Sequence, residues 1–307
     1  MAEQQGGFVT GPVTVAVPAT SANLGPGFDC LGLALALHDV LTGEVVPDGL
    51  EIEVLGEGSE TLPRDEHHLV VRAMRAAFAV LGVEPPGLRL RFENAIPQSR
   101  GLGSSSAAIV GGLALARALV VGGERFDDDS LLYLANRIEG HPDNVAPAVV
   151  GGFVVAGQAL STDGAEEVWA LSAPIAAAIS AVAFVPPTGV STEAARGLLP
   201  DQVPHAQAAA NTGRAAVLVA AMAGAPDQLL RGTEDFLHQS YRSPAMPESF
   251  ALVERLRSAG YAAFISGAGP TVLVLVADGA DLSERCPEGW AVHALAVDHA
   301  GVRVVPS

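Results

Sequence analysis

The sequence predicts an α+β protein of two domains, in which helices pack on one side of a mostly antiparallel sheet. At 307 residues the chain is long for one hydrophobic core, so we expect two domains, each with its own core. Apolar runs of strand length are interspersed with helix-like segments, and turns rich in Gly and Pro separate them. The pattern starts again near residue 158, which predicts an N-terminal domain over residues 1–157 and a C-terminal domain over residues 158–307.

The N-terminal half combines short strands with helices. Gly82 and the Pro85–Pro86 pair end the first predicted helix, and residues 127–130 offer N-caps for the third. Residues 18–29 have neither helical nor strand periodicity and predict a glycine-punctuated loop. The predicted strands cover residues 13–17, 31–37, 50–55, 88–92 and 148–156, and the predicted helices cover residues 70–81, 107–121 and 131–138.

The C-terminal half contains the most apolar stretch, residues 169–185. Pro174 interrupts this stretch and Pro186 and Pro187 follow it, which favours a loop and a buried strand within residues 175–185 over a membrane helix. Ser191 or Thr192 caps a helix that starts there. Further strands are predicted at residues 261–265, 272–277, 291–297 and 302–305, and further helices at residues 205–223, 226–231 and 248–259.

Composition and charge argue against several classes of function. The formal net charge of −17 argues against a nucleic-acid partner, because phosphate backbones are bound by basic surfaces. Every Lys/Arg position is arginine, which excludes a P-loop with Gly-Lys-Ser/Thr, Schiff-base chemistry and a catalytic lysine. Residues 1–10 lack the features of a secretory signal, and Cys30 and Cys286 make neither a disulfide framework nor a metal set. We expect a cytoplasmic protein with no membrane partner.

A Gly/Ser segment between a predicted strand and a predicted helix, residues 97–108, is the strongest candidate for a ligand site. Gly101 and Gly103 let the backbone bend sharply and approach a ligand closely. Residues 104–106 are three serines in the first helical turn, where unpaired N–H groups and the helix dipole favour phosphate. One serine hydroxyl is also able to ligate a magnesium ion carried by the phosphates. The alternative is a Gly/Ser turn that caps an ordinary buried helix.

Two other loops carry polar side chains suited to a ligand. Asn23 and Asp29 stand in the predicted loop of residues 18–29, where the alternative is that both only form Asx turns. In residues 139–144, Glu139 and Asp143 are able to bind a cation and His141 and Asn144 a polar ligand, unless the segment is a simple turn. A further glycine turn covers residues 266–271.

These glycine-containing loops, in this order, resemble the GHMP small-molecule kinases, and within them the homoserine kinase family. Residues 18–32 are similar to the N-terminal signature of that family, and residues 97–108 to the phosphate loop of the superfamily. Residues 139–147 resemble the metal and substrate segment, and residues 266–271 the third motif. The resemblance spans residues 13–276. It implies an N-terminal ribosomal-protein-S5-domain-2-like α/β domain followed by a C-terminal ferredoxin-like α+β domain.

The resemblance also implies ATP- and Mg2+-dependent phosphorylation of the L-homoserine side-chain hydroxyl, in threonine biosynthesis, and suggests a homodimer. The residues that it places along the nucleotide are Asn94, Pro97, Arg100, Gly101, Leu102, Gly103, Ser104, Ser105, Ser106 and Ala107, with Ser105 and Glu139 at the metal. The residues that it places around the amino acid are Asn23, Asp29, His141, Asn144, Thr192, Arg196, Arg242 and Gly267. Asp29 would face the ammonium group, Thr192 and both arginines the carboxylate, and Asn23 and Asn144 the reacting hydroxyl.

The chemistry of these residue types agrees with that division. A zwitterionic amino acid needs an anion for its ammonium and a cationic fork for its carboxylate, which Arg196 and Arg242 can supply in a chain without lysine. Asp29 belongs to the first half and both arginines to the second, so we expect a cleft between domains. The alternative for Arg196 is a solvated helix face.

Two features depart from the family pattern, and both the role of Asp143 and the choice between competing functions stay open. Glu139 stands only two residues before His141, and Arg100 stands inside the phosphate loop where small residues are usual. Asp143 is a candidate general base, although phosphoryl transfer needs mainly alignment and charge neutralisation. The competing functions are a GHMP kinase for a sugar, mevalonate or a related alcohol, and a non-catalytic sensor of nucleotide or metabolite.

Overall fold

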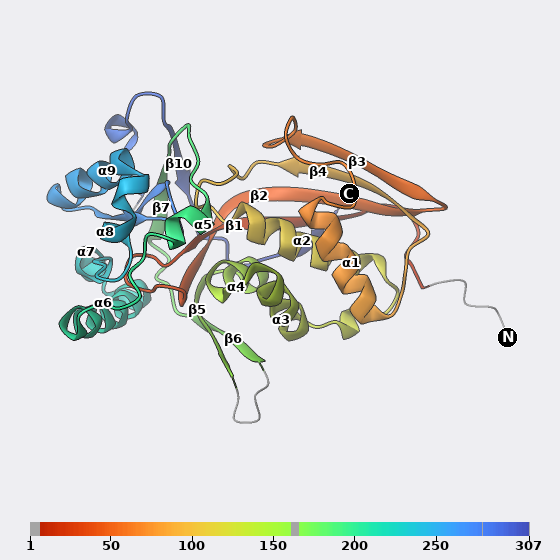
Figure 1. Ribbon diagram of the computed structural model, residues 1–307, viewed down its shortest axis with the longest axis horizontal. Helices are drawn as coiled ribbons and strands as arrows, with labels where there is room; N and C mark the ends of the chain where they lie inside the picture. Colours follow the sequence, from red (N-terminus) through yellow and green to blue (C-terminus); the bar gives the residue numbers. More distant parts are fainter. Residues whose placement is uncertain (1–6, 161–165, 278, 307) are drawn as a thin grey trace.

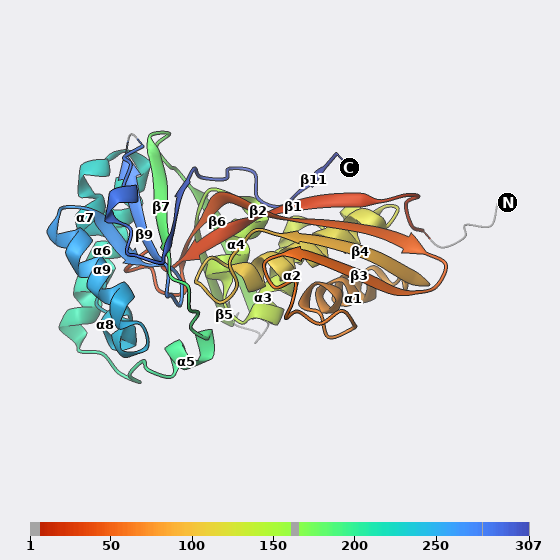
Figure 2. The same ribbon diagram turned by 90° about the horizontal axis from the view of Figure 1, so that it is seen from above.

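The computed structural model describes residues 7–160, 166–277 and 279–306, and contains two sheets. The first has the strand order β11-β1-β2-β4-β3, with β5 paired to β2 and β6 to β5 (Figure 1, with β11 labelled in Figure 2). All of its pairings are antiparallel except β3 with β4. Its strands are β1 (Val13–Ala22), β2 (Leu31–Val46), β3 (Gly49–Gly56), β4 (Gly87–Asn94), β5 (Phe153–Leu160), β6 (Glu166–Ala173) and β11 (Arg303–Val305).

Strand β1 is longer than the sequence predicts. The expected loop of residues 18–29 was wrong in its first part, because residues 18–22 continue the strand and pair with β2. The register shifts between Pro18 and Ala19, where a proline cannot supply a ladder N–H. This irregularity hides the strand period in the sequence. The loop itself begins at Asn23.

Four helices cover one side of this sheet (Figure 2): α1 (Leu69–Leu81), α2 (Ser104–Leu119), α3 (Asp128–Glu139) and α4 (Pro142–Val150). Gly82 ends α1 in the left-handed region at φ 70°, and Asp127 accepts a hydrogen bond from the Ser130 N–H at the start of α3, so both predicted helix signals are confirmed. Leucine, valine and alanine side chains from α2 and the strands fill the core between them.

The sequence does not predict helix α4 (Pro142–Val150): it predicts a helix over residues 131–138 and a strand over residues 148–156, with no helix between them. The helix starts with Pro142 at its first position and contains Pro147, whose missing N–H is usually a sign against helix. A helix of nine residues loses little from this proline, since its buried face packs on α2, α3 and β1.

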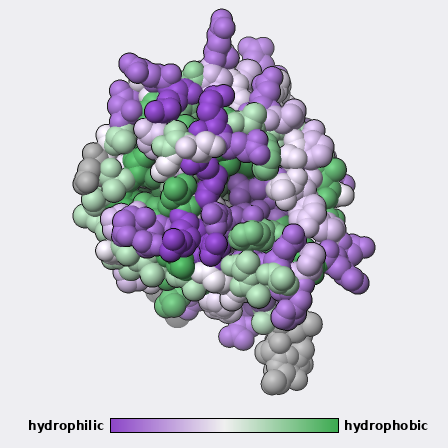
Figure 3. All heavy atoms as spheres, turned by 90° about the vertical axis from the view of Figure 1, so that its left-hand side faces the viewer, coloured by the Kyte–Doolittle hydropathy of each residue, from purple (hydrophilic) through white to green (hydrophobic). Residues whose placement is uncertain are grey.

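The C-terminal half folds around a second, antiparallel sheet of strand order β10-β7-β9-β8. Its strands are β7 (Ile179–Val185), β8 (Ala262–Ile265), β9 (Val272–Ala277) and β10 (Ala291–Leu295). The helices of this half are α5 (Thr192–Arg196), α6 (His205–Gly224), α7 (Leu229–Gly232), α8 (Gln239–Arg242) and α9 (Pro247–Ser258). The end of the molecule that this half forms carries hydrophilic side chains interrupted by smaller hydrophobic areas (Figure 3).

The two sheets do not divide the chain at one point. Strand β6 extends the first sheet past residue 157, and β11, near the end of the chain, pairs with β1 at its other edge. The sequence predicts a loop at the start of residues 169–185, where the second half of β6 lies. The side chains of β6 are mostly exposed, so it lacks the apolar alternation that marks a buried strand. Within the described residues, no helix is long and apolar enough to cross a membrane.

Candidate active site

An open cleft with about 560 Å³ of empty volume lies where the loops of both halves meet. It receives the loop after β1, the segment between β4 and α2, the turn between α3 and α4, and the turn between β8 and β9. The structure therefore brings together loops that lie far apart in the sequence. The predicted site residues that line it are Asn23, Gly101, Gly103, Ser104, Ser105, Glu139, His141, Asp143, Asn144, Arg196, Arg242 and Gly267.

The first turn of α2 faces this cleft without a side-chain cap. Gly103 is the N-cap residue at φ 71°, and no side-chain cap hydrogen bond is present among the described residues. Gly101 has φ 77°, and a Cβ there would collide with the Ser266 carbonyl oxygen, while one at Gly103 would collide with Thr20. Only glycine fits both positions. The backbone N–H groups of this turn are consequently available to an anion.

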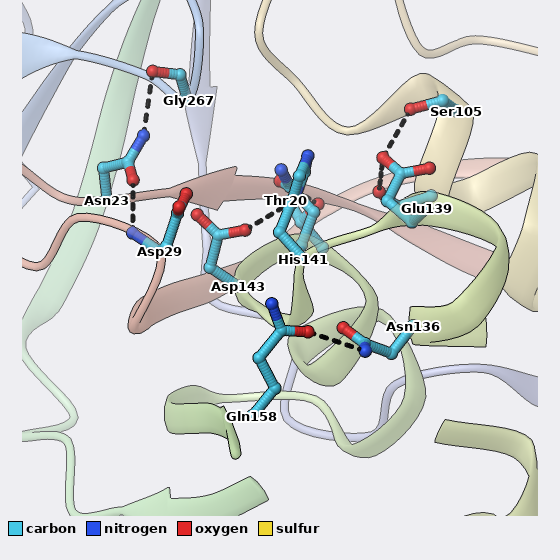
Figure 4. Close-up of polar contacts among 12 residues, drawn as sticks. Thr20, Asn23, Asp29, Ser105, Asn136, Glu139, His141, Asp143, Gln158 and Gly267 are labelled. Atoms are coloured by element: carbon cyan, nitrogen blue, oxygen red, sulfur yellow. Dashed lines mark hydrogen bonds and ion pairs between the residues drawn. The ribbon is translucent and has the colours of Figure 1, made fainter. Parts of the chain in front are cut away.

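A carboxylate stands against the same turn. The hydroxyl groups of Ser105 and Ser106 both donate to Oε1 of Glu139, at 2.7 and 2.8 Å (Figure 4). Gly140, in the left-handed region at φ 94°, ends α3 directly after Glu139 and allows the sharp turn into α4. The short spacing between Glu139 and His141 therefore still brings the carboxylate to the serines.

This arrangement fits a magnesium ion. Mg2+ is held in kinases by one or two carboxylates together with substrate phosphates and water, and hydroxyl and carboxylate oxygens are its preferred ligands. Glu139 and Ser105 are such donors beside an anion-binding helix end. The described residues contain no group of three or more His, Cys, Asp or Glu side chains suited to a metal.

The loop after β1 is held in a strained conformation. Asn23, Leu24 and Asp29 have positive φ angles of 69°, 49° and 53°, which non-glycine residues rarely adopt. The Asn23 amide Nδ2 donates to the Gly267 carbonyl at 3.0 Å, and its Oδ1 accepts from the Asp29 N–H at 3.0 Å (Figure 4). Asn23 thus ties the loop to the second half of the chain.

At the N-terminus of α4, His141 and Asp143 form a pair with Nδ1 and Oδ1 2.9 Å apart. Burial opposes protonation of His141, but the hydrogen bond and charge of Asp143, together with Glu139, raise the His141 pKa above its ordinary value. Beside them, Oδ1 of Asn144 accepts a 2.9 Å hydrogen bond from the Thr20 hydroxyl. The amide nitrogen of Asn144 is the group left to face a ligand. Sequence reasoning missed Thr20, which contacts Asn144 from 124 positions away.

Asp29 and Arg196 form a bidentate ion pair across the two halves, with nitrogen–oxygen distances of 2.6 and 3.1 Å. Burial works against the charge of Arg196, but the hydrogen bond and charge of Asp29 raise its pKa above the ordinary value. Both side chains are about one third exposed, and Arg196 lines the cleft, whereas Asp29 is not among its lining residues. The predicted ammonium partner and one predicted carboxylate partner are therefore paired with each other.

Arg242 is in a different state. It is 2% exposed and donates from Nη1 to the Gly267 carbonyl, while its Nε has no hydrogen-bond partner among the described residues. No carboxylate among the described residues lies within ion-pair distance of it. Burial lowers the pKa of Arg242 below its ordinary value, and the like charge of Arg196 acts in the same direction. The more distant charges of Asp29, Asp235 and Asp143 oppose this shift. A buried guanidinium at a cleft, with no carboxylate of the described residues in ion-pair contact, is suited to bind an anion.

A second cavity, with about 690 Å³ of empty volume, shares the lining residues Ser99, Ser104 and Ser105 with the cleft. Asp39 and His68, which sequence reasoning missed, lie in it beside the predicted Asn94 and several apolar side chains. Burial raises the Asp39 pKa to about 6, against the hydrogen bonds from two backbone N–H groups. Burial also lowers the His68 pKa to about 4, and within the described structure its Nε2 has no hydrogen-bond partner. An apolar slot with a few polar groups is suited to a nucleotide base.

Other predicted residues lie elsewhere. The Arg100 guanidinium donates to the carbonyl groups of Gln98, Pro186 and Pro187, which joins the Gly/Ser segment to the second half. Leu102 is fully buried and lines neither cavity, whereas Ala107, also fully buried, lines the second cavity. The Thr192 side chain lies outside the described part of the structure, although its backbone opens α5. Pro97 does not line the cleft or the second cavity.

Comparison with known proteins agrees with this geometry. The sequence models of the GHMP kinase N-terminal and C-terminal domains match residues 68–152 and 213–290. Homoserine kinase of Streptomyces avermitilis is 54% identical over 302 residues, which are 97% of this chain and 97% of that protein. The chain belongs to the homoserine kinase family of the GHMP superfamily. Homoserine kinase of Corynebacterium urealyticum is 50% identical over 86% of each chain.

Solved structures confirm the two-domain α+β fold of this family. Homoserine kinase from Cytophaga hutchinsonii has a TM-score of 0.83 and 27% sequence identity, covering 99% of this chain and 100% of that one. Mevalonate kinase of L. major has a TM-score of 0.65 at 15% identity, covering 97% and 98%, and shares the fold alone.

Proposed function

We propose that this protein transfers the γ-phosphoryl group of ATP to the side-chain hydroxyl of L-homoserine, giving O-phospho-L-homoserine. The observation that carries the proposal is the pairing of two anion sites in one cleft. One is the uncapped N-terminus of α2, and the other is the buried guanidinium of Arg242, which has no carboxylate partner in the described structure. Membership of the homoserine kinase family supports the choice of substrate.

The nucleotide would bind from the second cavity into the cleft. Residues 103–106 offer backbone N–H groups to the phosphates, and the N-terminal end of the α2 dipole favours the negative charge. The apolar cavity that holds Asp39 and His68 would receive the base, beside Asn94. Ser105 and Glu139 would hold the magnesium ion, which supplies charge neutralisation when it is bound. This cradle needs no lysine.

Binding of the amino acid would replace the ion pair between Asp29 and Arg196 by two new ones, one to each charge of the zwitterion. Asp29 and Arg196 neutralise each other in the structure, and a zwitterion brings the opposite charge to each. Its carboxylate would lie between Arg196 and Arg242, which line the cleft, and its ammonium group against Asp29, which is paired with Arg196. His141, Thr192 and the backbone of Gly267 would complete the pocket. A substrate with only one of the two charges would leave a charged side chain without a partner.

The hydroxyl would be aligned by side-chain amides. Asn144 has its Oδ1 occupied by Thr20, so its Nδ2 would face a ligand oxygen. Asn23 lines the same cleft, with its amide bonded to Gly267 and to the Asp29 N–H. We assign Asp143 to the orientation of His141 and not to proton abstraction, since its carboxylate is buried and hydrogen-bonded to the imidazole. Phosphoryl transfer through a loose transition state depends on alignment and charge stabilisation.

An acceptor panel tests the substrate. ADP formation from MgATP should require homoserine, and threonine, mevalonate and galactose should support less than about 1% of its kcat/KM, because each misses the primary hydroxyl or the ammonium–carboxylate pair. Equal turnover of mevalonate or galactose would assign the protein to another GHMP activity. Binding of MgATP and homoserine without any turnover would instead assign it to a sensor.

Two coarser proposals follow from the family. We place the protein in the cytoplasm, where ATP and Mg2+ are supplied, and we propose a homodimer. Light scattering at micromolar concentration measures the second directly, and a mass of one chain, 31.2 kDa, would exclude it.

A further inference from the structure

His238 is a buried histidine that the proposed reaction does not use. Its side chain is 0% exposed and lies between the two halves of the chain. Nε2 is 2.8 Å from the carbonyl oxygen of Gly25, in the loop that carries Asn23 and Asp29. Nδ1 is 3.3 Å from Nη1 of Arg242, one helical turn further along α8. The ring therefore bridges the loop of the first half and the cationic side chain of the second.

The hydrogen-bond partners determine the tautomer. A carbonyl oxygen only accepts, so Nε2 carries the proton, and Nδ1 presents its lone pair to the guanidinium group. Burial lowers the His238 pKa, and the positive charge of Arg242 lowers it further, whereas the Asp235 carboxylate opposes both effects. The pKa is lowered overall, so the neutral imidazole is favoured. Arg242 consequently has an acceptor at Nη1 where a protonated imidazole would repel it.

Phe28 completes the arrangement. Its ring centroid lies 5.2 Å from the His238 ring, and the guanidinium carbons of Arg242 and Arg196 lie 5.4 and 5.5 Å from it. Cation–π contacts with this ring stabilise both guanidinium groups, but they do not fix how each guanidinium is rotated within its own plane. The hydrogen bonds to His238 and to the Gly267 carbonyl restrict that rotation for Arg242. Its Nε and Nη2 are thereby left for a ligand.

We propose that His238 is a positioning residue for substrate recognition: its Nδ1 holds the Arg242 guanidinium in the orientation that receives the carboxylate of the amino acid. The inference rests on the proposed homoserine site. It differs from a purely structural role, in which His238 only links α8 to the Gly25 turn through Nε2. The two roles use different nitrogen atoms and can be separated.

Two substitutions separate them. His238→Asn places an amide oxygen near the position of Nδ1 and keeps the acceptor for Arg242, while the bond to Gly25 is lost. His238→Gln places an amide near the position of Nε2 and keeps the bond to Gly25, while Arg242 loses its acceptor. We expect His238→Gln to raise KM for homoserine by about 10- to 100-fold, and His238→Asn by no more than about threefold. KM for ATP should change by less than about twofold in both.

The affinity of a substrate analogue that lacks the carboxylate distinguishes a positioning role of His238 from a purely structural one. 3-Aminopropan-1-ol has the hydroxyl and the ammonium group of homoserine but no carboxylate. If His238 acts through Arg242, the inhibition constant of this analogue stays within about twofold of wild type in His238→Gln. Thermal unfolding of both variants is measured alongside. Equal losses of homoserine affinity in the Asn and Gln variants, or an equal loss for the analogue, would overturn the positioning role.

Arg242→Ala distinguishes failure of this inference from failure of the proposed site. If Arg242→Ala leaves KM for homoserine unchanged, the carboxylate site itself is wrong. If Arg242→Ala raises KM for homoserine but His238→Gln does not, only the role of His238 is refuted. Calorimetric titration with homoserine gives the same comparison in variants that lack turnover.

Discussion

Arg242 shows how a single residue marks the substrate site. Burial of an arginine without a carboxylate partner is costly, and the loss is offset when a ligand anion completes the pair. Ser105 has the complementary role at the other wall of the cleft, where its hydroxyl joins Glu139 to the first turn of α2. The two residues belong to different halves of the chain and serve different substrates in the proposed reaction.

Substitution of each residue tests this division of labour. Arg242→Ala should raise KM for homoserine through the loss of about 2–4 kcal/mol of charge-assisted binding, and KM for ATP should change little. Ser105→Ala should impair the use of MgATP and leave homoserine affinity intact. Arg137→Ala, an exposed arginine outside the cleft, is the control and should leave both KM values unchanged. Equal effects on both substrates in either cleft variant would refute the division.

Asp143→Asn tests the assignment of this carboxylate to orientation. The substitution removes the charge that raises the His141 pKa, so the His141 pKa should fall, as followed by NMR titration of the imidazole. The variant should retain more than about a tenth of wild-type kcat, since general-base catalysis is worth about 10²- to 10⁴-fold. If kcat instead falls by about 10²- to 10⁴-fold while KM for homoserine is unchanged, Asp143 would be assigned to proton abstraction.

Sequence reasoning found the residues whose type and spacing carry the chemistry, such as the Gly/Ser segment and the His-Pro-Asp-Asn turn. It did not find Thr20, His68 or His238. Each of these acts through a partner distant in sequence or through burial, and a lone histidine or threonine in a chain has no distinguishing local pattern. His68 and His238 gain their significance only when the structure shows an unpartnered or shared ring nitrogen.

Helix α2 is the element on which the nucleotide site depends. Its uncapped N-terminus follows two left-handed glycines, and its buried face packs against α1 and β1. The helix is thereby fixed by the core while its first turn remains open to the cleft. A rigid helix end with free N–H groups stabilises phosphate charge without reorganisation.

Gly103→Ala should damage this element selectively. The new Cβ would collide with Thr20, and φ 71° is unfavourable for alanine by about 1–2 kcal/mol. We expect KM for ATP to rise by at least about tenfold, with a smaller change for homoserine. Gly213→Ala is the matched control: this glycine lies exposed in α6 with open space around it, and alanine should stabilise the helix by about 0.5–1 kcal/mol. An unchanged KM for ATP in Gly103→Ala would contradict the phosphate cradle.

The elements that were predicted wrongly share a physical cause. Helix α4 contains a proline and β6 has an exposed face, so neither shows the local pattern of its class. Tertiary packing decides both: α4 packs on α2 and α3, and β6 pairs with β5 along its full length. Helices with clear caps, such as α1 and α3, were predicted to within a few residues because their boundaries are set by local chemistry.

In the whole molecule, hydrogen bonds across the two halves hold the cleft in shape. The Ser266 hydroxyl donates to the Gly101 carbonyl, Asn23 donates to Gly267, and Arg100 reaches the carbonyl groups before α5. The phosphate segment, the strained loop and the turn between β8 and β9 are thus fixed relative to one another. Their sequence order gave the resemblance to a kinase family, but their contacts could be known only from the folded chain.

The arrangement of both substrates in this cleft is decided by a crystal structure with L-homoserine, Mg2+ and a nonhydrolysable ATP analogue. We predict that the phosphates contact the backbone N–H groups at the first turn of α2. The carboxylate of homoserine should contact Arg242, its ammonium group Asp29, and its hydroxyl should face the terminal phosphate. A triphosphate bound away from α2, or an amino acid whose carboxylate does not reach Arg242, would contradict the proposed site.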